Sequence, residues 1–132
     1  MIATNTENTI IAKEDFDIIR TYLNTKKELV RDEKSAYLLS RLESASVCSE
    51  DEFPWDGVRL NTKVILRDKL ARLNYTYTVV LPEEADHRKC KVSLFSSIGS
   101  AIFGYRRGDD INWHTPKGKR YFTIMAVSQL TK

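Results

Sequence analysis

The sequence predicts an α+β chain in which a helical N-terminal part precedes a β-rich C-terminal part. Before residue 49 apolar residues recur at helical spacing, whereas after residue 57 they alternate with a period of two. Between these parts, residues 49–57 gather acidic residues, a proline and a glycine, which is typical of a linker. The predicted organisation is an N-terminal segment with a short helical hairpin over residues 1–48, a linker over 49–57 and a C-terminal domain over 58–132.

Two apolar stripes predict the helices of the N-terminal part. The first stripe comprises Ile18, Ile19, Tyr22 and Leu23, and the second comprises Leu38, Leu39, Leu42 and Ala45. In the second helix we expect Arg41 and Glu43 to face water. The connection has two alternatives: the capping box Thr25-Lys26-Lys27-Glu28 starts the second helix at once, or residues 24–33 form a loop and the helix starts near Ser35. Either alternative gives an antiparallel pair.

Alternating apolar residues predict the strands of the C-terminal part. The expected strands lie at 58–66 with an irregularity at 61–63, and at 74–81, 91–95, 111–113 and 121–127. Residues 96–105 carry Ile98, Ala101, Ile102 and Tyr105 at the spacing of the inner face of one short helix. Several antiparallel strands wrapping one short helix form an α+β domain.

Composition restricts the class of protein. The 132 residues suffice for one domain, or a compact domain with a small appendage, and 42% of them are hydrophobic. Only Cys48 and Cys90 are cysteines, which excludes a disulfide framework and suits a reducing compartment. We find neither a run of apolar residues that would span a bilayer nor a secretory signal, so we expect a cytoplasmic protein with no membrane contact.

The two parts of the chain carry opposite charge. Residues 1–56 hold 7 Lys and Arg against 12 Asp and Glu, a net charge of −5, whereas residues 57–132 hold 14 against 6, a net charge of +8. The basic part suits nucleic acid or an acidic protein surface. The acidic part would be repelled by a phosphate backbone, which argues against a protein that simply coats DNA.

Few residues are candidates for catalysis or for binding a metal or an anion. The two histidines, His87 and His114, lie outside any nucleophile motif, so a hydrolase is disfavoured. Together with Cys48 and Cys90 they would make four zinc ligands, but only one close pair exists, and we predict no metal and no cofactor. The carboxylate pairs Asp32-Glu33 and Asp109-Asp110 are explained by a helix start and a turn. The basic clusters 106–107 and 117–120 are explained as solvated turns.

A long ordered pattern in the C-terminal part resembles the bacterial Gre factors. Residues 82–93 are similar to that family's acidic turn followed by a strand, and residues 96–109, SSIGSAIFGYRRGD, resemble its signature Ser-Pro-(apolar)-Gly-x-Ala-Leu-(apolar)-Gly-x-x-x-Gly-Asp. Trp113, Pro116 and Gly118 fall in register. Residues 48–54 and 58–64 are similar to the linker of the short Rnk-like branch, the regulators of nucleoside diphosphate kinase. The resemblance covers roughly residues 8–128.

The resemblance implies a fold and a partner. It implies a C-terminal domain like FK506-binding protein that carries the helical hairpin and docks on the rim of the RNA polymerase secondary channel. The family's docking segment, Asp-Ser-Pro, corresponds to Phe95, Ser96 and Ser97, followed by Ile98; two of its three positions depart from the family pattern. The hairpin tip corresponds to Arg31, Asp32 and Glu33, where long Gre factors carry two acids that hold a catalytic Mg²⁺.

The predicted function is therefore non-catalytic. Helical arms of roughly 10–20 residues extend only about 15–30 Å, so we expect the tip to fall short of the polymerase active centre. The protein would then compete with longer Gre factors without stimulating transcript cleavage. Arg31 and Lys34, beside the two tip acids, would also oppose a metal there. We expect a monomer.

Two other functions remain open. One is a nucleic-acid-binding module that uses the basic part, and weak nonspecific contact with nucleic acid would also be compatible with docking. The other is a peptidyl-prolyl isomerase, suggested by the implied fold alone. Its aromatic residues, Tyr77, Phe95, Phe103 and Trp113, are expected in the core instead.

Overall fold

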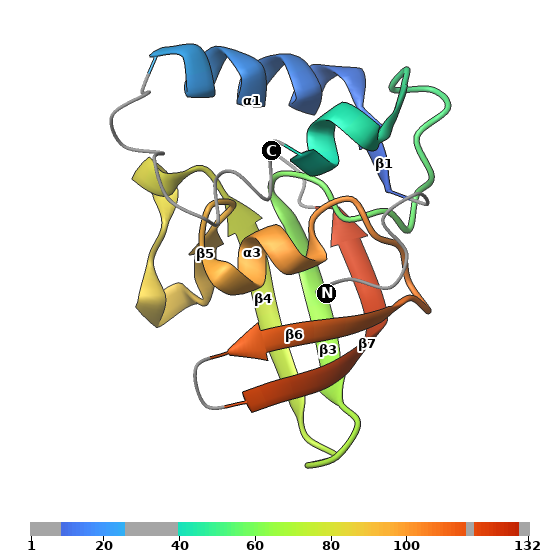
Figure 1. The fold of residues 1–132 in the computed structure, drawn as a ribbon, viewed down its shortest axis with the longest axis vertical. Coiled ribbons are helices and arrows are strands. Elements are labelled where there is room, and N and C mark those ends of the chain that lie inside the picture. Colours follow the sequence, from blue (N-terminus) through green and yellow to red (C-terminus); the bar gives the residue numbers. More distant parts are fainter. Residues whose placement is uncertain (1–8, 26–39, 116–117, 130–132) are drawn as a thin grey trace.

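The computed structural model describes residues 9–25, 40–115 and 118–129, and shows two sheets with helices packed beside them (Figure 1). The predicted hairpin tip at residues 31–33 lies outside the described residues, as do Pro116 and Lys117. The elements in chain order are β1 (Ile10–Ala12), α1 (Lys13–Thr25), β2 (Ser46–Cys48), β3 (Thr62–Asp68), β4 (Asn74–Val80), the 3-10 turns η3 (Pro82–Glu84) and η4 (His87–Lys89), β5 (Lys91–Ser93), α3 (Ser97–Ile102), β6 (Asp110–Thr115) and β7 (Gly118–Gln129).

The larger sheet has five strands in the order β5-β4-β3-β7-β6. Three of its pairs are antiparallel, but β4 and β5 are parallel, so the prediction of a wholly antiparallel sheet is wrong. The physical reason is the chain after β4, which turns back through η3 and η4 before β5 begins. β5 thereby joins the edge of the sheet in the same direction as β4 (Figure 1).

Strand boundaries differ from the prediction at two places. The strand expected over 58–66 begins only at Thr62, because Asn61 has a φ of 63° and turns the chain there. The strand expected to reach residue 95 ends at Ser93, and Ser96 then caps α3. The predicted strands at 74–81, 111–113 and 121–127 correspond to β4, β6 and β7, and the predicted helix at 96–105 is α3.

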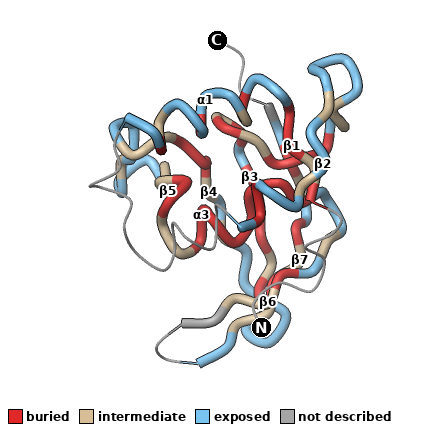
Figure 2. The backbone as a smooth tube through the Cα atoms, turned by 45° about the horizontal axis from the view of Figure 1, so that its top comes forward, coloured by how far each residue is buried: buried red, intermediate tan, exposed pale blue. Residues whose placement is uncertain are grey.

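One continuous hydrophobic core joins both parts of the chain. Figure 2 shows the buried residues gathered between the larger sheet and the helices. The core takes Ile19 and Leu23 from α1, Val64 from β3, Ile102 from α3 and Phe122 from β7. Because both parts bury side chains in the same core, the N-terminal part packs directly on the C-terminal part.

The N-terminal part contains α1 and a second helical stretch at residues 40–44. Thr25 is the last residue of α1, and its hydroxyl donates to the Thr21 carbonyl oxygen. The predicted connection to the second helix lies in residues 26–39, outside the described residues. Ile19 and Leu23 are buried as predicted, whereas Ile18, placed on the same stripe, is 37% exposed. No helix among the described residues is long and apolar enough to cross a membrane.

A small parallel sheet at the base of the N-terminal part was not predicted. β1 and β2 pair from Ile10 opposite Ser46 to Ala12 opposite Cys48. Three-residue strands are too short for alternation to be recognised in a sequence. Since β1 precedes α1 and β2 follows residues 40–44, the small sheet holds the entry and the exit of the N-terminal part side by side.

Candidate functional site

The Phe95–Ile98 segment, to which the sequence assigns docking, forms the junction between β5 and α3. Ser96 is the N-cap of α3: its Oγ accepts a hydrogen bond from the Gly99 N–H at 3.1 Å and donates to the Ser93 carbonyl oxygen at 2.6 Å. A Cβ at Gly99 would lie 2.1 Å from that same oxygen, so only glycine allows this close approach. Cap and glycine together fix the segment against the end of β5.

The four side chains of the segment lie at different depths. Phe95 and Ile98 are buried in this chain, whereas Ser96 and Ser97 are half-buried. Ser97 Oγ accepts a hydrogen bond from Trp113 Nε1 at 2.7 Å. A partner that approached the segment would therefore meet the two serines, with Phe95 and Ile98 acting as the packing beneath them.

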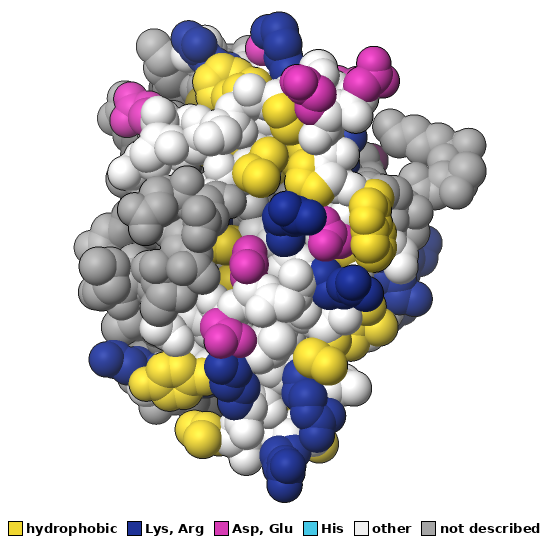
Figure 3. Space-filling view, turned by 90° about the vertical axis from the view of Figure 1, so that its right-hand side faces the viewer, with side chains coloured by type: hydrophobic (Ala, Val, Ile, Leu, Met, Phe, Trp, Pro, Cys, Tyr) yellow, Lys and Arg dark blue, Asp and Glu magenta, His cyan; other side chains and the backbone are white. Residues whose placement is uncertain are grey.

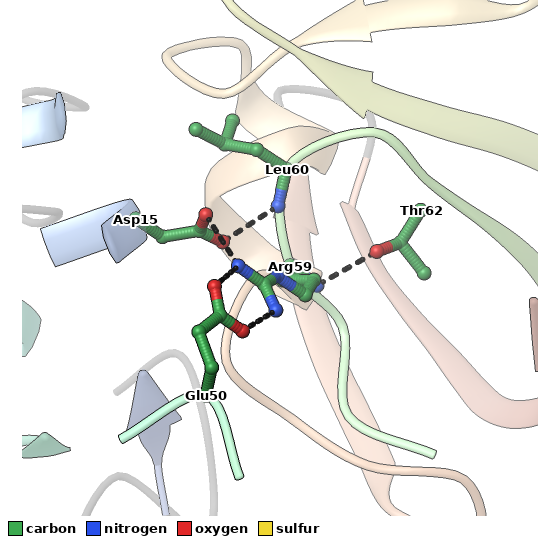
Figure 4. Close-up of polar contacts among 5 residues, drawn as sticks. All are labelled: Asp15, Glu50, Arg59, Leu60 and Thr62. Atoms are coloured by element: carbon green, nitrogen blue, oxygen red, sulfur yellow. Dashed lines mark hydrogen bonds and ion pairs between the residues drawn. The ribbon is translucent and has the colours of Figure 1, made fainter. Parts of the chain in front are cut away.

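A polar network ties α1 to the start of the C-terminal domain (Figure 4). The Asp15 carboxylate accepts the Leu60 backbone N–H at 3.0 Å and contacts Arg59 Nη2 at 3.1 Å. Glu50 binds the same guanidinium through both carboxylate oxygens, at 2.5 and 2.7 Å, and the Arg59 backbone N–H donates to Thr62 Oγ1 at 3.1 Å. Arg59 thus links α1, the 49–57 segment and the turn before β3.

The surroundings shift the pKa values of the two carboxylates of this network in opposite directions. Burial raises the pKa of Asp15 from its usual value, although the Leu60 N–H and Arg59 pull it down. The Arg59 hydrogen bonds lower the pKa of Glu50, which keeps more contact with water and therefore loses less hydration. The same pairing raises the pKa of Arg59, so its positive charge persists at any physiological pH.

Arg41 makes a second link between the two parts. Its Nη1 and Nη2 donate to the carbonyl oxygens of Ser100 and Phe103 at the C-terminal end of α3, and the guanidinium lies 4.6 Å from the centre of the Tyr105 ring. The prediction that Arg41 faces water is wrong, because only 2% of the residue is exposed. A cation at a helix C-terminus satisfies carbonyls that lack partners within the helix.

Two further contacts complete the attachment. The Ile10 N–H donates to the Gly104 carbonyl oxygen at 3.0 Å, and Tyr22 stacks on Phe95 with ring centres 5.4 Å apart. We call the contacts made by Ile10, Asp15, Tyr22 and Arg41 the joint. The joint reaches both ends of α3, so it fixes the N-terminal part relative to the Phe95–Ile98 segment.

Sequence reasoning did not single out Asp15, Arg59 or the buried role of Arg41. A charged residue on a helix looks solvent-facing unless its partner is known, and the partners of Asp15 and Arg41 are distant in the chain. Arg41 next to the apolar Leu42 was the one available signal, since an arginine beside a core position can reach a helix end.

The other candidates from the sequence are the hairpin tip, the possible zinc ligands and the aromatic residues. Arg31, Asp32 and Glu33 are outside the described residues. His87 and Cys90 are exposed, and the part of the chain that the structure describes contains no group of three His, Cys, Asp or Glu able to hold a metal. Of the four aromatic residues considered for an isomerase, Phe95 and Phe103 are buried, and Tyr77 and Trp113 are half-buried.

Some cations of the basic part have acidic partners. Arg106 pairs with Asp56 at 2.9 Å, Lys69 with Asp110 at 2.9 Å and Arg120 with Asp68 at 3.0 Å. Figure 3 shows that acidic and basic side chains are interspersed on one face, with Lys and Arg more frequent in its lower half. Each of these pairs places a carboxylate beside a cation, which weakens the local attraction of that cation for phosphate.

Comparison with known proteins relates this architecture to transcription factors. The family model described as transcription elongation factor GreA/GreB, C-terminal, matches residues 53–129. GreA of Desulfovibrio desulfuricans is 33% identical over 92 residues, which cover 70% of this chain and 57% of that GreA. The regulator of nucleoside diphosphate kinase of Escherichia coli is 32% identical over 81 residues, 61% of this chain and 60% of the relative.

The structural comparison agrees with the sequence comparison. The solved structure described as a prokaryotic transcription elongation factor GreA/GreB from Nitrosomonas europaea superposes with a TM-score of 0.76 at 26% identity, over 92% of this chain and 98% of that chain. The match to the curated relatives spans less than two thirds of their length. The family model nevertheless covers more than half of the chain, which therefore belongs to the GreA/GreB family of transcription elongation factors.

Proposed function

We propose that this protein binds RNA polymerase at the rim of the secondary channel through the Phe95–Ile98 segment, and that it regulates transcription without catalysing a reaction. Membership of the GreA/GreB family is the observation that carries the proposal. The geometry of the segment supports it, since the N-cap at Ser96 and the close approach at Gly99 hold two half-buried serines on a rigid base. Rigid sites bind with a smaller loss of conformational freedom.

The joint supports a second part of the proposal, which is that the helical N-terminal part forms an arm directed into the channel. Because the joint contacts both ends of α3, docking through the Phe95–Ile98 segment would also orient α1. The arm would be short: the 13 residues of α1 rise only about 20 Å. We propose that a tip on such an arm stops short of the polymerase active centre, so the protein occupies the channel entrance and competes with longer Gre factors.

The proposal includes the finer features implied by the family resemblance. These are a C-terminal domain like FK506-binding protein and a helical hairpin with its tip near residues 31–33. The proposal further includes a monomeric protein in the cytoplasm. The interspersed ion pairs of the basic part favour polymerase over free nucleic acid as the main partner. Weak contact with nucleic acid would accompany docking rather than replace it.

The test is binding of the purified chain to core RNA polymerase, with a long Gre factor as competitor. We expect saturable binding that the competitor displaces, and no stimulation of transcript cleavage in stalled elongation complexes. Binding that the competitor does not affect would exclude a shared rim site. Cleavage stimulation would overturn the short-arm argument, and no binding at micromolar protein would overturn the proposal as a whole.

A further inference from the structure

An open groove runs between the C-terminal half of α1 and the chain that follows β4. Its volume is about 560 Å³, and mostly apolar atoms form its wall. The lining residues are Asp17, Ile18, Thr21, Tyr22, Thr25, Leu81 and Glu83. None of them belongs to the Phe95–Ile98 segment.

The groove exists because the core buries only some of the apolar side chains of α1 and leaves others at the surface. Ile19 and Leu23 fill the core, whereas Ile18 remains 37% exposed and Tyr22 is half-buried. Across the groove Leu81 is also half-buried. A partner that covered these side chains would gain roughly 25 cal/mol for each Å² of apolar surface removed from water.

The two charged residues that line the groove are both acidic, and one of them, Asp17, also pairs with Lys13 at 3.3 Å. Asp17 lines one side of the groove and Glu83 the other, where Glu83 accepts a hydrogen bond from the Tyr22 hydroxyl. Glu84 follows on the same turn but does not line the groove. An acidic rim repels phosphate, which excludes nucleic acid as the occupant, and it attracts Lys or Arg.

The groove is continuous with the proposed docking site. Tyr22 lines the groove and also stacks on Phe95, with 5.4 Å between the ring centres. A protein that reached Ser96 and Ser97 would therefore have the groove beside it.

We propose that the groove receives an apolar side chain flanked by Lys or Arg from a protein segment of RNA polymerase, as a second contact beside the Phe95–Ile98 segment. This inference rests on the proposed function and adds to it a named surface and the chemistry of the segment that fits there. It predicts that part of the binding strength is independent of the two serines.

The experiment measures the affinity of the fluorescently labelled full chain for core RNA polymerase. Ile18→Ser removes the exposed apolar contact, and Glu83→Lys reverses the charge of the rim. Glu84→Lys is the matched control for charge, because Glu84 does not line the groove. Leu70→Ser is the control for loss of an exposed apolar residue, since Leu70 is 76% exposed in the turn between β3 and β4.

We expect each groove variant to weaken binding about tenfold, the size of a moderate interface contact, and each control to change it less than about twofold. Far-ultraviolet circular dichroism and urea unfolding establish that the variants are folded. Glu83→Lys should also make binding less dependent on salt, because an attractive charge pair is replaced by a repulsive one.

The outcomes separate this inference from the proposed function. If the wild type binds polymerase and both groove variants bind equally well, the groove inference is wrong and the proposed function stands. If the wild type does not bind, both fail. If the wild type self-associates in sedimentation, and Ile18→Ser abolishes that without changing polymerase affinity, the occupant is a second copy and the inference is overturned.

Discussion

Replacing Asp15 tests whether the joint holds the two parts of the protein together. Asp15 is 3% exposed and makes two contacts, with the Leu60 N–H at 3.0 Å and with Arg59 at 3.1 Å. Asp15→Ala leaves a buried N–H without an acceptor, which costs about 1–3 kcal/mol. It also removes one of the two carboxylates of Arg59, at a cost of about 1 kcal/mol, because Glu50 still neutralises the guanidinium.

The expected loss for Asp15→Ala is therefore about 2–4 kcal/mol of unfolding free energy, a large part of the 5–15 kcal/mol typical of a domain. Asp15→Asn retains an acceptor for the Leu60 N–H and should lose only about 1 kcal/mol. Urea unfolding measures both differences, and an unchanged dependence on urea concentration would show that the native state keeps its compactness.

Asp17→Ala is the matched control on the same helix. The Asp17 side chain is 58% exposed and pairs with Lys13 at 3.3 Å one turn away, so its removal should change stability by less than about 0.5 kcal/mol. If Asp15→Ala costs no more than this control, the network in Figure 4 does not attach α1 to the C-terminal domain, and the orientation argument fails with it.

Three further changes test other parts of the structure. Because Arg59 lowers the pKa of Glu50, the ionised Glu50 carboxylate stabilises the fold above the ordinary pKa of 4.5, and this stabilisation disappears as pH falls through the lowered pKa. Urea unfolding from pH 3 to 7 should therefore show the unfolding free energies of wild type and Glu50→Gln converging at the acid end. Gly99→Ala should cost roughly 1–3 kcal/mol, since its Cβ would meet a β5 carbonyl at 2.1 Å. Ser97→Ala should cost about 1 kcal/mol and accelerate solvent exchange of the Trp113 indole N–H in NMR spectra.

Each of these has a contradicting result. If the unfolding free energies of wild type and Glu50→Gln differ by the same amount from pH 3 to 7, the negative charge of Glu50 does not stabilise the protein. Wild-type stability in Gly99→Ala would show that α3 does not approach β5 closely. An unchanged exchange rate in Ser97→Ala would mean that the indole N–H donates to some other group.

Local pattern was enough to predict the strands and the short helix of the C-terminal domain. β4 and β7 are long and rich in β-branched and aromatic residues, so their character follows from their own sequence. α3 was predictable from the inward spacing of Ile98, Ala101 and Ile102, all of which are buried. The family resemblance rested on this same stretch and was confirmed.

Features that depend on distant partners were not predictable. The parallel pairing of β5 depends on how η3 and η4 turn the chain, and no residue within β5 encodes the direction of its neighbour. Arg41 has the local surroundings of a surface residue, yet its partners are the carbonyls of Ser100 and Phe103, about sixty positions later. The joint arises from tertiary packing, which the helical periodicity of residues 13–25 does not contain.

The pairing of β1 with β2 has a mechanical consequence. A segment attached to a body at one point can swivel, whereas one clamped along two adjacent strands resists rotation about its own axis. The Ile10 N–H extends this clamp to the Gly104 carbonyl, just beyond α3. A force on α1 would thus be transmitted to α3 as torque, so α1 and the junction at Ser96 and Ser97 would move as one rigid unit.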